Sequence, residues 1–404
     1  MDTSLAIGYL VPQFPTQTHA FFWREARALE EAGVRVQFLS TTRPPPDSCP
    51  HDFADAARER TRYLFPPKIL DAVRGLALRP RRTIQAVGYV LGLRETPIVE
   101  RMKLLMLVPT AMDLVNTVRQ QDIGHVHIHS CATAAHLGAL GNILDELNYS
   151  LTLHGDLPVY GTDHPAKMQR ARFVSTVTRP LQKSLESEIG KDRPYPLIWM
   201  GVDTKLFRPK PDRQPRVPSD PLRILTVARL NAAKGHIYCL RAIAKLREDG
   251  IDIHYQIAGE GAARRDIEAE IGKLGLGDHV TLLGSVSEQT VLSLLHETHV
   301  VALTSIGLGE AAPVAVMEAM ACGVPCIVSV IGGAPDMIDT GRNGILVPQK
   351  DVAAIADAME RIATEPGLLD AMSLQARKTA EQTFDHRHNA LKLYAAIKGE
   401  FEDL

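Results

Sequence analysis

The stretch Glu310-Ala-Ala-Pro-Val-Ala-Val-Met-Glu318, which continues as Ala-Met-Ala-Cys-Gly-Val-Pro325, decides how the second half of the chain folds. Pro313 suits the first turn of a helix, because proline lacks the N–H that would be left unpaired there. Gly323 suits the position just past the helix end, and Pro325 prevents the helix from resuming. The pattern therefore predicts a short helix that contains Glu318, preceded by a loop that contains Glu310.

The start of this helix is a predicted anion site, because the first N–H groups of a helix have no partner within it and bind phosphate well. Glu318 would lie about 7–8 Å deeper than Pro313, at about 1.5 Å rise per residue. A phosphate with a carboxylate on either side fits a nucleotide sugar. One carboxylate would accept hydrogen bonds from the sugar and the other from the ribose. The alternative is a surface helix with two solvated glutamates.

Length and composition limit the class of protein. The chain has 404 residues, which exceeds the size at which one hydrophobic core keeps growing, so two domains are expected. Hydrophobic residues make up 45% and charged residues 23%, as in ordinary globular proteins, and the net charge of −2 argues against a nucleic acid partner. Five cysteines without a Cys-x-x-Cys pair indicate a reducing compartment. With no signal segment and no apolar run of about 18 residues, we expect a cytoplasmic protein.

The first part of the chain alternates between strand and helix patterns. Residues 5–11 form a short apolar run, residues 21–31 have helical spacing, and residues 34–39 are again typical of a strand. A β-α-β start predicts a parallel sheet with crossover helices. Ligands bind at the carboxyl ends of such strands, so we expect the loop of residues 12–18 to face a site.

The same alternation resumes after a proline-rich linker. Residues 209–221 are rich in proline and charge, which predicts a boundary between a first domain, residues 1–208, and a second domain, residues 222–384. We expect residues 385–404 to form a helix that packs back on the first domain, and residues 41–66 to be irregular. Further strands are predicted at residues 125–129, 149–153, 172–177, 223–228, 255–259, 280–284, 300–304 and 343–348.

Charged and titratable side chains follow several of these strands. His154 comes directly after a predicted strand and precedes Gly155, which makes it an active-site candidate or a histidine that caps a turn. Arg229 and Lys234 are five positions apart after another strand. Two cations placed there could both reach a diphosphate, and the alternative is a pair of exposed cations on a loop.

Two further patterns have a structural and a functional interpretation. His125, His127 and His129 alternate along one strand and share one face, but no fourth ligand stands nearby, so we predict no metal site. Residues 67–120 contain basic and apolar helical segments, including Arg79-Pro-Arg-Arg82. Such a surface can lie on an anionic membrane. We favour helices that simply cover the sheet with their arginines outward, and peripheral contact with the inner membrane stays open.

Six motifs in a fixed order make the chain resemble a known family. They are Gly201-Val-Asp-Thr-Lys-Leu-Phe-Arg-Pro209, Val227-Ala-Arg-Leu-Asn-Ala-Ala-Lys-Gly235, Ile257-Ala-Gly-Glu-Gly261, the stretch from Glu310 to Pro325, Ile331-Gly-Gly-Ala-Pro-Asp336 and Asn343-Gly-Ile-Leu-Val-Pro348. This set resembles the family 4 glycosyltransferases. The resemblance implies an α/β protein of the GT-B fold, with two Rossmann-like domains that face each other across a cleft. The N-terminal segment looks like a subgroup that assembles bacterial exopolysaccharides such as colanic acid.

The resemblance also implies roles for residues at the matching positions. Arg229 and Lys234 would hold the donor diphosphate, Glu310 the sugar hydroxyls and Glu318 the ribose, with His154 beside the reacting carbon. The mouth of the helix at Ala312, Pro313 and Val314 would bind the donor, and Gly284 and Val286 would contact the base. The resemblance implies retention of configuration and no metal or cofactor, with a UDP- or GDP-sugar as co-substrate. No Asp-x-Asp motif occurs in the sequence, which agrees with this.

The sequence departs from the family pattern at three places. The loop with Phe14 and Thr18 carries His19 where the subgroup often has glutamate, and Ala311 stands where glycine is usual. The glycine-rich phosphate loop that the family often has after its first strand is also replaced, by Pro12-Gln-Phe-Pro15. The N-terminal resemblance implies a glycan or lipid-linked glycan acceptor. His19 and Ala311 leave a small-molecule natural product as the alternative, and a nucleotide-sugar epimerase is a third possibility.

Overall fold

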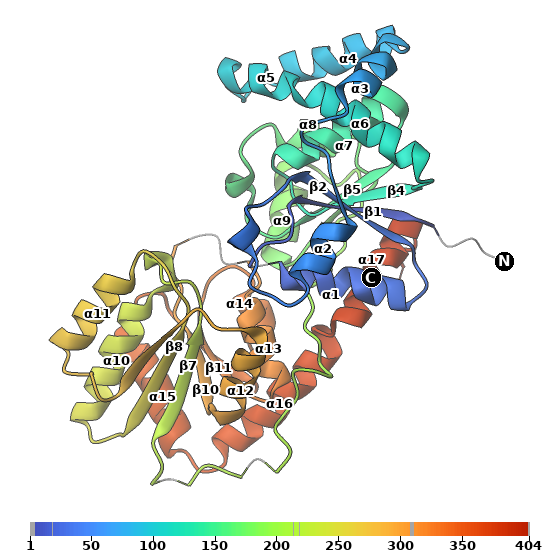
Figure 1. The fold of residues 1–404 in the computed structure, drawn as a ribbon. Coiled ribbons are helices and arrows are strands. Elements are labelled where there is room, and N and C mark those ends of the chain that lie inside the picture. Colours follow the sequence, from blue (N-terminus) through green and yellow to red (C-terminus); the bar gives the residue numbers. More distant parts are fainter. Residues whose placement is uncertain (1–4, 18, 213, 218, 308–310, 403–404) are drawn as a thin grey trace. The chain divides into compact units, whose positions relative to one another are not determined.

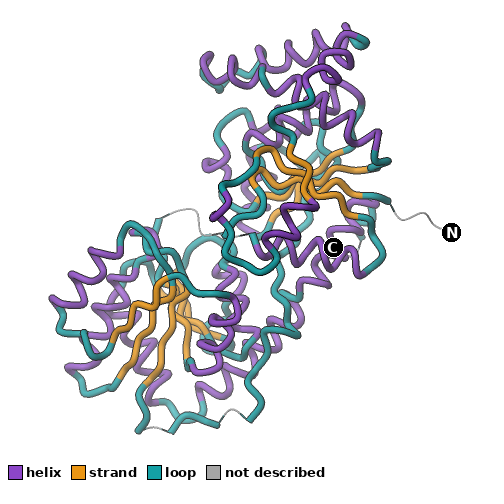
Figure 2. The backbone as a smooth tube through the Cα atoms, in the orientation of Figure 1, coloured by secondary structure: helices purple, strands orange, loops and turns teal. Residues whose placement is uncertain are grey.

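The computed structural model of the chain describes residues 5–17, 19–212, 214–217, 219–307 and 311–402, and these form two compact units. Unit 1 comprises Met1–Trp199 and Arg387–Leu404, and unit 2 comprises Met200–His386. In each unit a parallel sheet has helices on both faces (Figures 1 and 2). The predicted α/β class is thereby confirmed. No helix within the described ranges is long and apolar enough to span a bilayer.

Unit 1 is organised around a six-stranded sheet with strand order β3-β2-β1-β4-β5-β6. In this sheet Leu10 pairs with Leu39 of one neighbouring strand and with Ile128 of the other. The strands are β1 (Ile7–Gln13), β2 (Val36–Thr42), β3 (Thr61–Tyr63), β4 (His125–Ile128), β5 (Tyr149–Leu153) and β6 (Val174–Thr176). The helices are α1 (Ala20–Glu31), α2 (Ala54–Arg60), α3 (Ile69–Ala77), α4 (Pro80–Leu91), α5 (Ile98–Leu105), α6 (Leu107–Gln120), α7 (Thr133–Asp145), α8 (His164–Met168), α9 (Arg179–Glu188) and α17 (His386–Lys398).

Successive side chains of a strand point to opposite faces of the sheet. In a parallel sheet both faces are covered, so neighbouring residues of one strand enter two different hydrophobic clusters. Leu10 belongs to the hydrophobic cluster that includes residues of α6 and α7. Its neighbours Tyr9 and Val11 belong to a second cluster, which includes residues of α1 and of α17. The C-terminal helix therefore contributes to the core of unit 1.

The prediction that residues 41–66 are irregular is wrong in part. This stretch contains α2 and the short edge strand β3, which pairs with β2 between Ser40 and Tyr63. A three-residue strand is too short to show the two-residue period that sequence reasoning needs. Pairing with a preformed neighbour decides its conformation instead.

Unit 2 has a second six-stranded sheet, with strand order β12-β11-β10-β7-β8-β9. Its strands are β7 (Leu222–Val227), β8 (Ile253–Ala258), β9 (Val280–Gly284), β10 (Val300–Leu303), β11 (Cys326–Ser329) and β12 (Gly344–Val347). Its helices are α10 (His236–Glu248), α11 (Arg264–Lys273), α12 (Glu288–Glu297), α13 (Val314–Ala321), α14 (Ala334–Met337), α15 (Val352–Thr364) and α16 (Leu368–Thr383). Sequence reasoning missed β11, because four consecutive buried residues carry no period.

The predicted short helix is present as α13. Pro313 lies at its N-cap, one position before the predicted first turn, and Gly323 follows its end with φ +68°. The Cys322 N–H donates to the carbonyl oxygen of Glu318 at the last turn. The start and stop signals of the sequence therefore placed this helix to within one residue.

Candidate active site

The loops that follow β7, β8, β9 and β10 form one hydrogen-bonded edge at the carboxyl ends of the unit 2 strands. The Leu230 N–H donates to Glu260 O at 2.9 Å, which joins the loops after β7 and β8. The Gly259 N–H donates to Gly284 O at 2.7 Å, and the Ile306 N–H donates to Ala233 O at 2.7 Å. We call these loops, residues 228–235, 259–261, 284–286 and 304–306, the unit 2 rim.

Two glycines allow the rim loops to approach this closely. Gly259 has φ +151°, and a Cβ there would lie 1.9 Å from the carbonyl oxygen of Ala228. Gly235 has φ +66°, and a Cβ there would lie 2.0 Å from the carbonyl oxygen of Thr304. A side chain at either position would push neighbouring backbone segments apart, since both obstacles are main-chain atoms.

The predicted diphosphate-binding cations lie on the same rim segment. Arg229 is exposed, and within the described ranges no hydrogen bond or ion pair engages its guanidinium. Lys234 ends a short 3₁₀ turn (Ala232–Lys234), and its N–H donates to Asn231 Oδ1 at 3.1 Å. The turn thus brings the two cations onto one loop at the end of β7.

The helix α13 is the next element of unit 2 after β10. Ala311, Ala312 and Pro313 are buried, and the carbonyl oxygen of Ala311 accepts a hydrogen bond from Gly333 N–H at 2.7 Å. Val314 and Glu318 are half-buried. Gly284 and Val286, predicted to contact the base, are half-buried on the rim as well. Glu310, the predicted sugar ligand, lies outside the described residues.

In unit 1, His154 lies just past the carboxyl end of β5. Its Nε2 lies 3.2 Å from His129 Nδ1, and its backbone N–H donates to the Tyr160 hydroxyl at 2.8 Å. The rings of Phe21 and Phe22 pack against its imidazole, with ring centroids 5.4 and 5.2 Å away. Burial lowers the pKa of His154 to about 3, so the imidazole is neutral at physiological pH. The neutral ring keeps one N–H, so it can donate one hydrogen bond and accept another, but it carries no positive charge.

A glutamate whose side chain is mostly buried next to these histidines was missed by sequence reasoning. Glu25 on α1 accepts a hydrogen bond from the Tyr9 hydroxyl at 2.7 Å, and the same Oε1 lies 3.5 Å from His129 Nε2. Burial raises the pKa of Glu25 to about 7. Its position offered a signal, because Glu25 is three residues from Phe22 and four from Leu29, on the buried face of α1.

The other two histidines of this stretch, His125 and His127, have ring nitrogens in hydrogen-bond contact with serine and threonine hydroxyl groups. His125 Nε2 and His127 Nδ1 both lie 2.7 Å from Ser150 Oγ, and His127 Nε2 lies 2.7 Å from Thr152 Oγ1. Burial lowers the pKa of both imidazoles. Among the described residues, the group that could hold a metal ion is instead Asp252, His254 and His279, at the amino-terminal ends of β8 and β9.

The surroundings of the predicted acceptor-side residues Phe14 and His19 differ from each other. Phe14 is fully buried and stacks on Phe38 with ring centroids 5.2 Å apart. His19 precedes α1, contacts the Phe22 ring, and has its pKa lowered to about 4 by burial. Thr18 lies outside the described residues. An acceptor role for this loop stays a prediction.

Comparison with known proteins gives the family. Residues 207–379 match the family described as glycosyl transferases group 1. The chain is 33% identical over 276 residues to the amylovoran biosynthesis glycosyltransferase AmsK of Erwinia amylovora, which covers 64% of this chain and 67% of that protein. It is also 33% identical over 195 residues to the putative colanic acid biosynthesis glycosyltransferase WcaL of Escherichia coli K12, 46% of this chain and 47% of that protein.

The match to WcaL thus spans about half of that relative's length. Among solved structures, Anabaena HepE in complex with UDP superposes with a TM-score of 0.74 at 16% identity, covering 98% of this chain and 100% of HepE. This likeness confirms the predicted GT-B fold. The chain belongs to the group 1 glycosyltransferases.

Proposed function

We propose that this protein is a retaining glycosyltransferase that moves a hexosyl unit from a nucleotide-diphosphate sugar to a glycan or lipid-linked glycan in bacterial polysaccharide biosynthesis. The observation that carries the proposal is the unit 2 rim, which holds Arg229 and Lys234 on one loop at the carboxyl ends of the strands. Relatives named for colanic acid and amylovoran biosynthesis support the polysaccharide assignment.

The donor would bind to unit 2. Arg229, Lys234 and the first N–H groups of α13 would hold the diphosphate, since charged donors and a helix N-terminus both favour phosphate. Glu318 would hold the ribose, Glu310 the sugar, and the backbone at Gly284 and Val286 the base. A uridine nucleotide is the first donor to test, because HepE was solved with UDP.

Transfer would break the bond between the sugar C1 and the diphosphate oxygen and form a bond from C1 to the acceptor oxygen on the same face. The acceptor hydroxyl proton would pass to the departing phosphate oxygen, so no covalent enzyme intermediate and no metal are required. Arg229 and Lys234 would stabilise the negative charge that develops on the diphosphate. Such preorganised electrostatics are commonly the largest catalytic contribution. His154, neutral and held by His129, would position the sugar.

The acceptor would bind to unit 1, on the cytoplasmic side of the membrane where nucleotide sugars are available. A small-molecule acceptor is the second candidate, because His19 stands where the polysaccharide subgroup often has glutamate and Ala311 stands where glycine is usual in the main motif. These two acceptor classes predict different products with the same donor.

A donor panel tests the proposal. Purified protein is incubated with UDP-, GDP-, ADP- and dTDP-sugars in the presence of EDTA, and release of nucleoside diphosphate is followed. We expect release from one donor class and retained configuration in the product, and we expect release to be about 10²- to 10³-fold slower in Lys234→Ala. Absence of release from every donor, together with no binding in calorimetry, would contradict the proposed donor site. Addition of a lipid-linked glycan or an aminocyclitol then separates the two acceptor classes.

A further inference from the structure

The helices α3, α4 and α5 carry large apolar side chains that the rest of unit 1 does not cover. Leu70 is 84% exposed, Ile84 is 72% exposed and Met102 is 56% exposed. Figure 1 shows these three helices as the outermost ones of the unit, beyond α6 and α7. We call their exposed surface, within residues 68–106, the α3–α5 face. So many exposed apolar residues on neighbouring helices indicate an interaction surface rather than isolated surface residues.

The apolar residues of each helix lie on one side of it. In α3, Ile69, Leu70 and Val73 fall within an arc of about 100°, at 3.6 residues per turn. Ala72 and Gly75, on the opposite side of the same helix, are buried. The exposed residues therefore form a stripe directed away from the core.

The same arrangement recurs in the next two helices. In α4, Ile84 and Leu91 are exposed and lie seven residues apart, two turns along one side. In α5, the exposed residues Ile98, Val99 and Met102 again fall within about 100°. Three helices thus present three apolar stripes.

Cations flank these stripes. Residues 67–106 contain eight lysine and arginine residues and three acidic residues, a net charge of +5, whereas the whole chain carries −2. Lys68, Arg74 and Arg81 are exposed, while Lys103 pairs with Glu100 at 2.7 Å. Arg74 follows the α3 stripe by one residue, which is about 100° around the helix from Val73. The segment that carries the apolar stripes is therefore basic overall, and exposed cations lie beside the stripes in the sequence.

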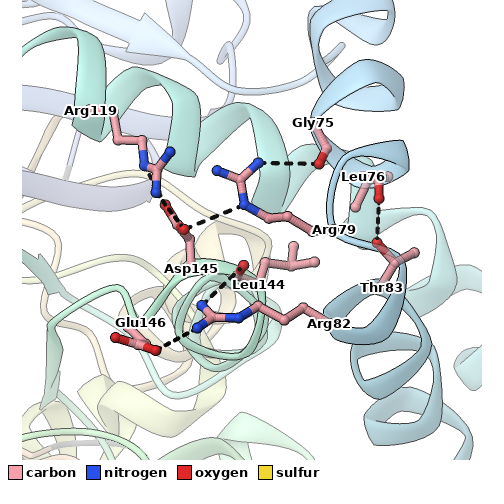
Figure 3. Close-up of polar contacts among 9 residues, drawn as sticks. All are labelled: Gly75, Leu76, Arg79, Arg82, Thr83, Arg119, Leu144, Asp145 and Glu146. Atoms are coloured by element: carbon pink, nitrogen blue, oxygen red, sulfur yellow. Dashed lines mark hydrogen bonds and ion pairs between the residues drawn. The ribbon is translucent and has the colours of Figure 1, made fainter.

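Polar contacts join this layer to the rest of unit 1, in addition to the buried residues such as Ala86 and Val90 that pack α4 into the core. In Figure 3, Arg79 and Arg119 both pair with Asp145 at the end of α7, and the Thr83 hydroxyl donates to Leu76 O at 2.9 Å. The loop between α4 and α5 is held by Asp163, whose carboxylate accepts the Thr96 N–H at 2.8 Å. The helices that carry the apolar stripes are thus attached to the rest of unit 1, and the stripes remain exposed.

We propose that the α3–α5 face docks this protein on an anionic lipid bilayer. Apolar side chains would enter the boundary between headgroups and acyl chains, and the flanking cations would contact anionic headgroups. A second copy of the chain fits less well, because a two-fold interface would set one net charge of +5 against another. This inference goes beyond the proposed function, since it concerns attachment and not transfer.

Vesicle cosedimentation tests the proposal. The full chain is mixed with phosphatidylglycerol or phosphatidylcholine vesicles, and the bound fraction is measured. We expect binding to the anionic vesicles only, weakened by 0.5 M salt. The variant Lys68→Gln/Arg74→Gln/Arg81→Gln should bind on the order of 100-fold more weakly, from about 1 kcal/mol for each cation near the surface. The variant Leu70→Gln/Ile84→Gln/Met102→Gln should also lose binding.

Matched variants of exposed residues elsewhere are the controls. The cation control is Lys183→Gln/Lys245→Gln/Arg265→Gln, and the apolar control is Val217→Gln/Leu374→Gln/Leu391→Gln. Both controls should bind like wild type. The proposal is overturned if wild type does not bind anionic vesicles, or if the face and control variants behave alike. A dimer in solution that the apolar face variant dissociates would assign the face to a second copy instead. Donor turnover without vesicles is measured in parallel, so a failed transferase assay and a failed membrane assay are distinguished.

Discussion

Unit 1 and unit 2 hold their candidate site residues in different ways. In unit 2, main-chain hydrogen bonds join the loops of the rim, and glycines at 235 and 259 make the approach possible. In unit 1, side chains from distant segments meet: His154 lies just past β5, His129 just past β4, and Glu25 on α1. The backbone geometry of the rim loops is set by short sequence motifs. The side-chain cluster of unit 1 forms only once the strands and α1 have packed together. Four substitutions test this difference, from the largest expected effect to the smallest.

Gly259→Ala should break the unit 2 rim. The new methyl group would lie 1.9 Å from Ala228 O, and the backbone at φ +151° is strained for any other residue. We expect a loss of about 4 kcal/mol in the free energy of unfolding, measured by urea titration. Gly250→Ala, at a positive φ with no atom within 4 Å, is the matched control and should cost about 1 kcal/mol. Equal losses in the two variants would show that strain alone, and not the close approach, matters at Gly259.

Lys234→Ala should leave the rim folded and remove its charge. Loss of one preorganised electrostatic donor costs about 3–4 kcal/mol in the activation free energy, so kcat should fall about 10²- to 10³-fold. The thermal unfolding temperature should stay near that of wild type. Lys245→Ala, an exposed lysine of α10, is the control and should keep full activity. Wild-type kcat in Lys234→Ala would remove Lys234 from the proposed site.

Glu25→Gln should stabilise unit 1 at alkaline pH. Burial raises the pKa of Glu25 from 4.5 to about 7, so between these values the folded state keeps a proton that the unfolded state has lost. Stability therefore falls as pH rises from 4.5 to 7, by about 3 kcal/mol in total. Glutamine does not titrate, and its carbonyl oxygen can still accept from Tyr9.

The stability difference between Glu25→Gln and wild type should thus be small at pH 4 and reach about 3 kcal/mol at pH 8. Burial also lowers the pKa of His154 and of His19, which costs stability as pH falls below 6.5, but both proteins share this loss. Their difference therefore isolates Glu25. A difference that does not change with pH would show that Glu25 is ionised in the folded protein.

Arg82→Ala should have the smallest effect. Arg82 pairs with Glu146, whose side chain is 79% exposed, and exposed ion pairs contribute little (Figure 3). We expect a loss below about 1 kcal/mol in urea titration, because buried residues such as Ala86 and Val90 attach α4 to the core. Val90→Ala is the comparison, with an expected loss of about 2 kcal/mol. A larger loss for Arg82→Ala than for Val90→Ala would mean that ion pairs hold the layer.

Helices and strands whose ends are marked by nearby residues, such as proline, glycine or a run of strand-forming residues, were placed well from the sequence. Pro313 and Gly323 placed α13 to within one residue, and the strands from 149 to 153 and from 280 to 284 were placed at their observed bounds. The misses were β3 and β11, which have three and four residues. Such strands are set by pairing with a neighbour rather than by a period of their own.

The candidate site residues also divide into those that the sequence predicts and those that it does not. Arg229 and Lys234 were predicted because they follow a strand end in a recognisable motif. The structure places them on one loop of the rim, and their role as diphosphate ligands stays a prediction. Glu25 was not found, because a glutamate within an amphipathic helix is ordinarily solvated. Its partners Tyr9 and His129 are 16 and 104 positions away in the sequence. No spacing rule connects residues at such separations.

The sequence by itself determined the α/β class, the family, and the loops that carry the predicted donor ligands. These follow from short-range rules, since helix caps, strand periods and glycine-dependent turns act over a few residues. The tertiary structure alone decided that Glu25 joins His129 and His154, and that the apolar stripes of α3, α4 and α5 face outward. Burial and exposure depend on which segments pack together, and this packing sets both the pKa of Glu25 and the existence of the α3–α5 face.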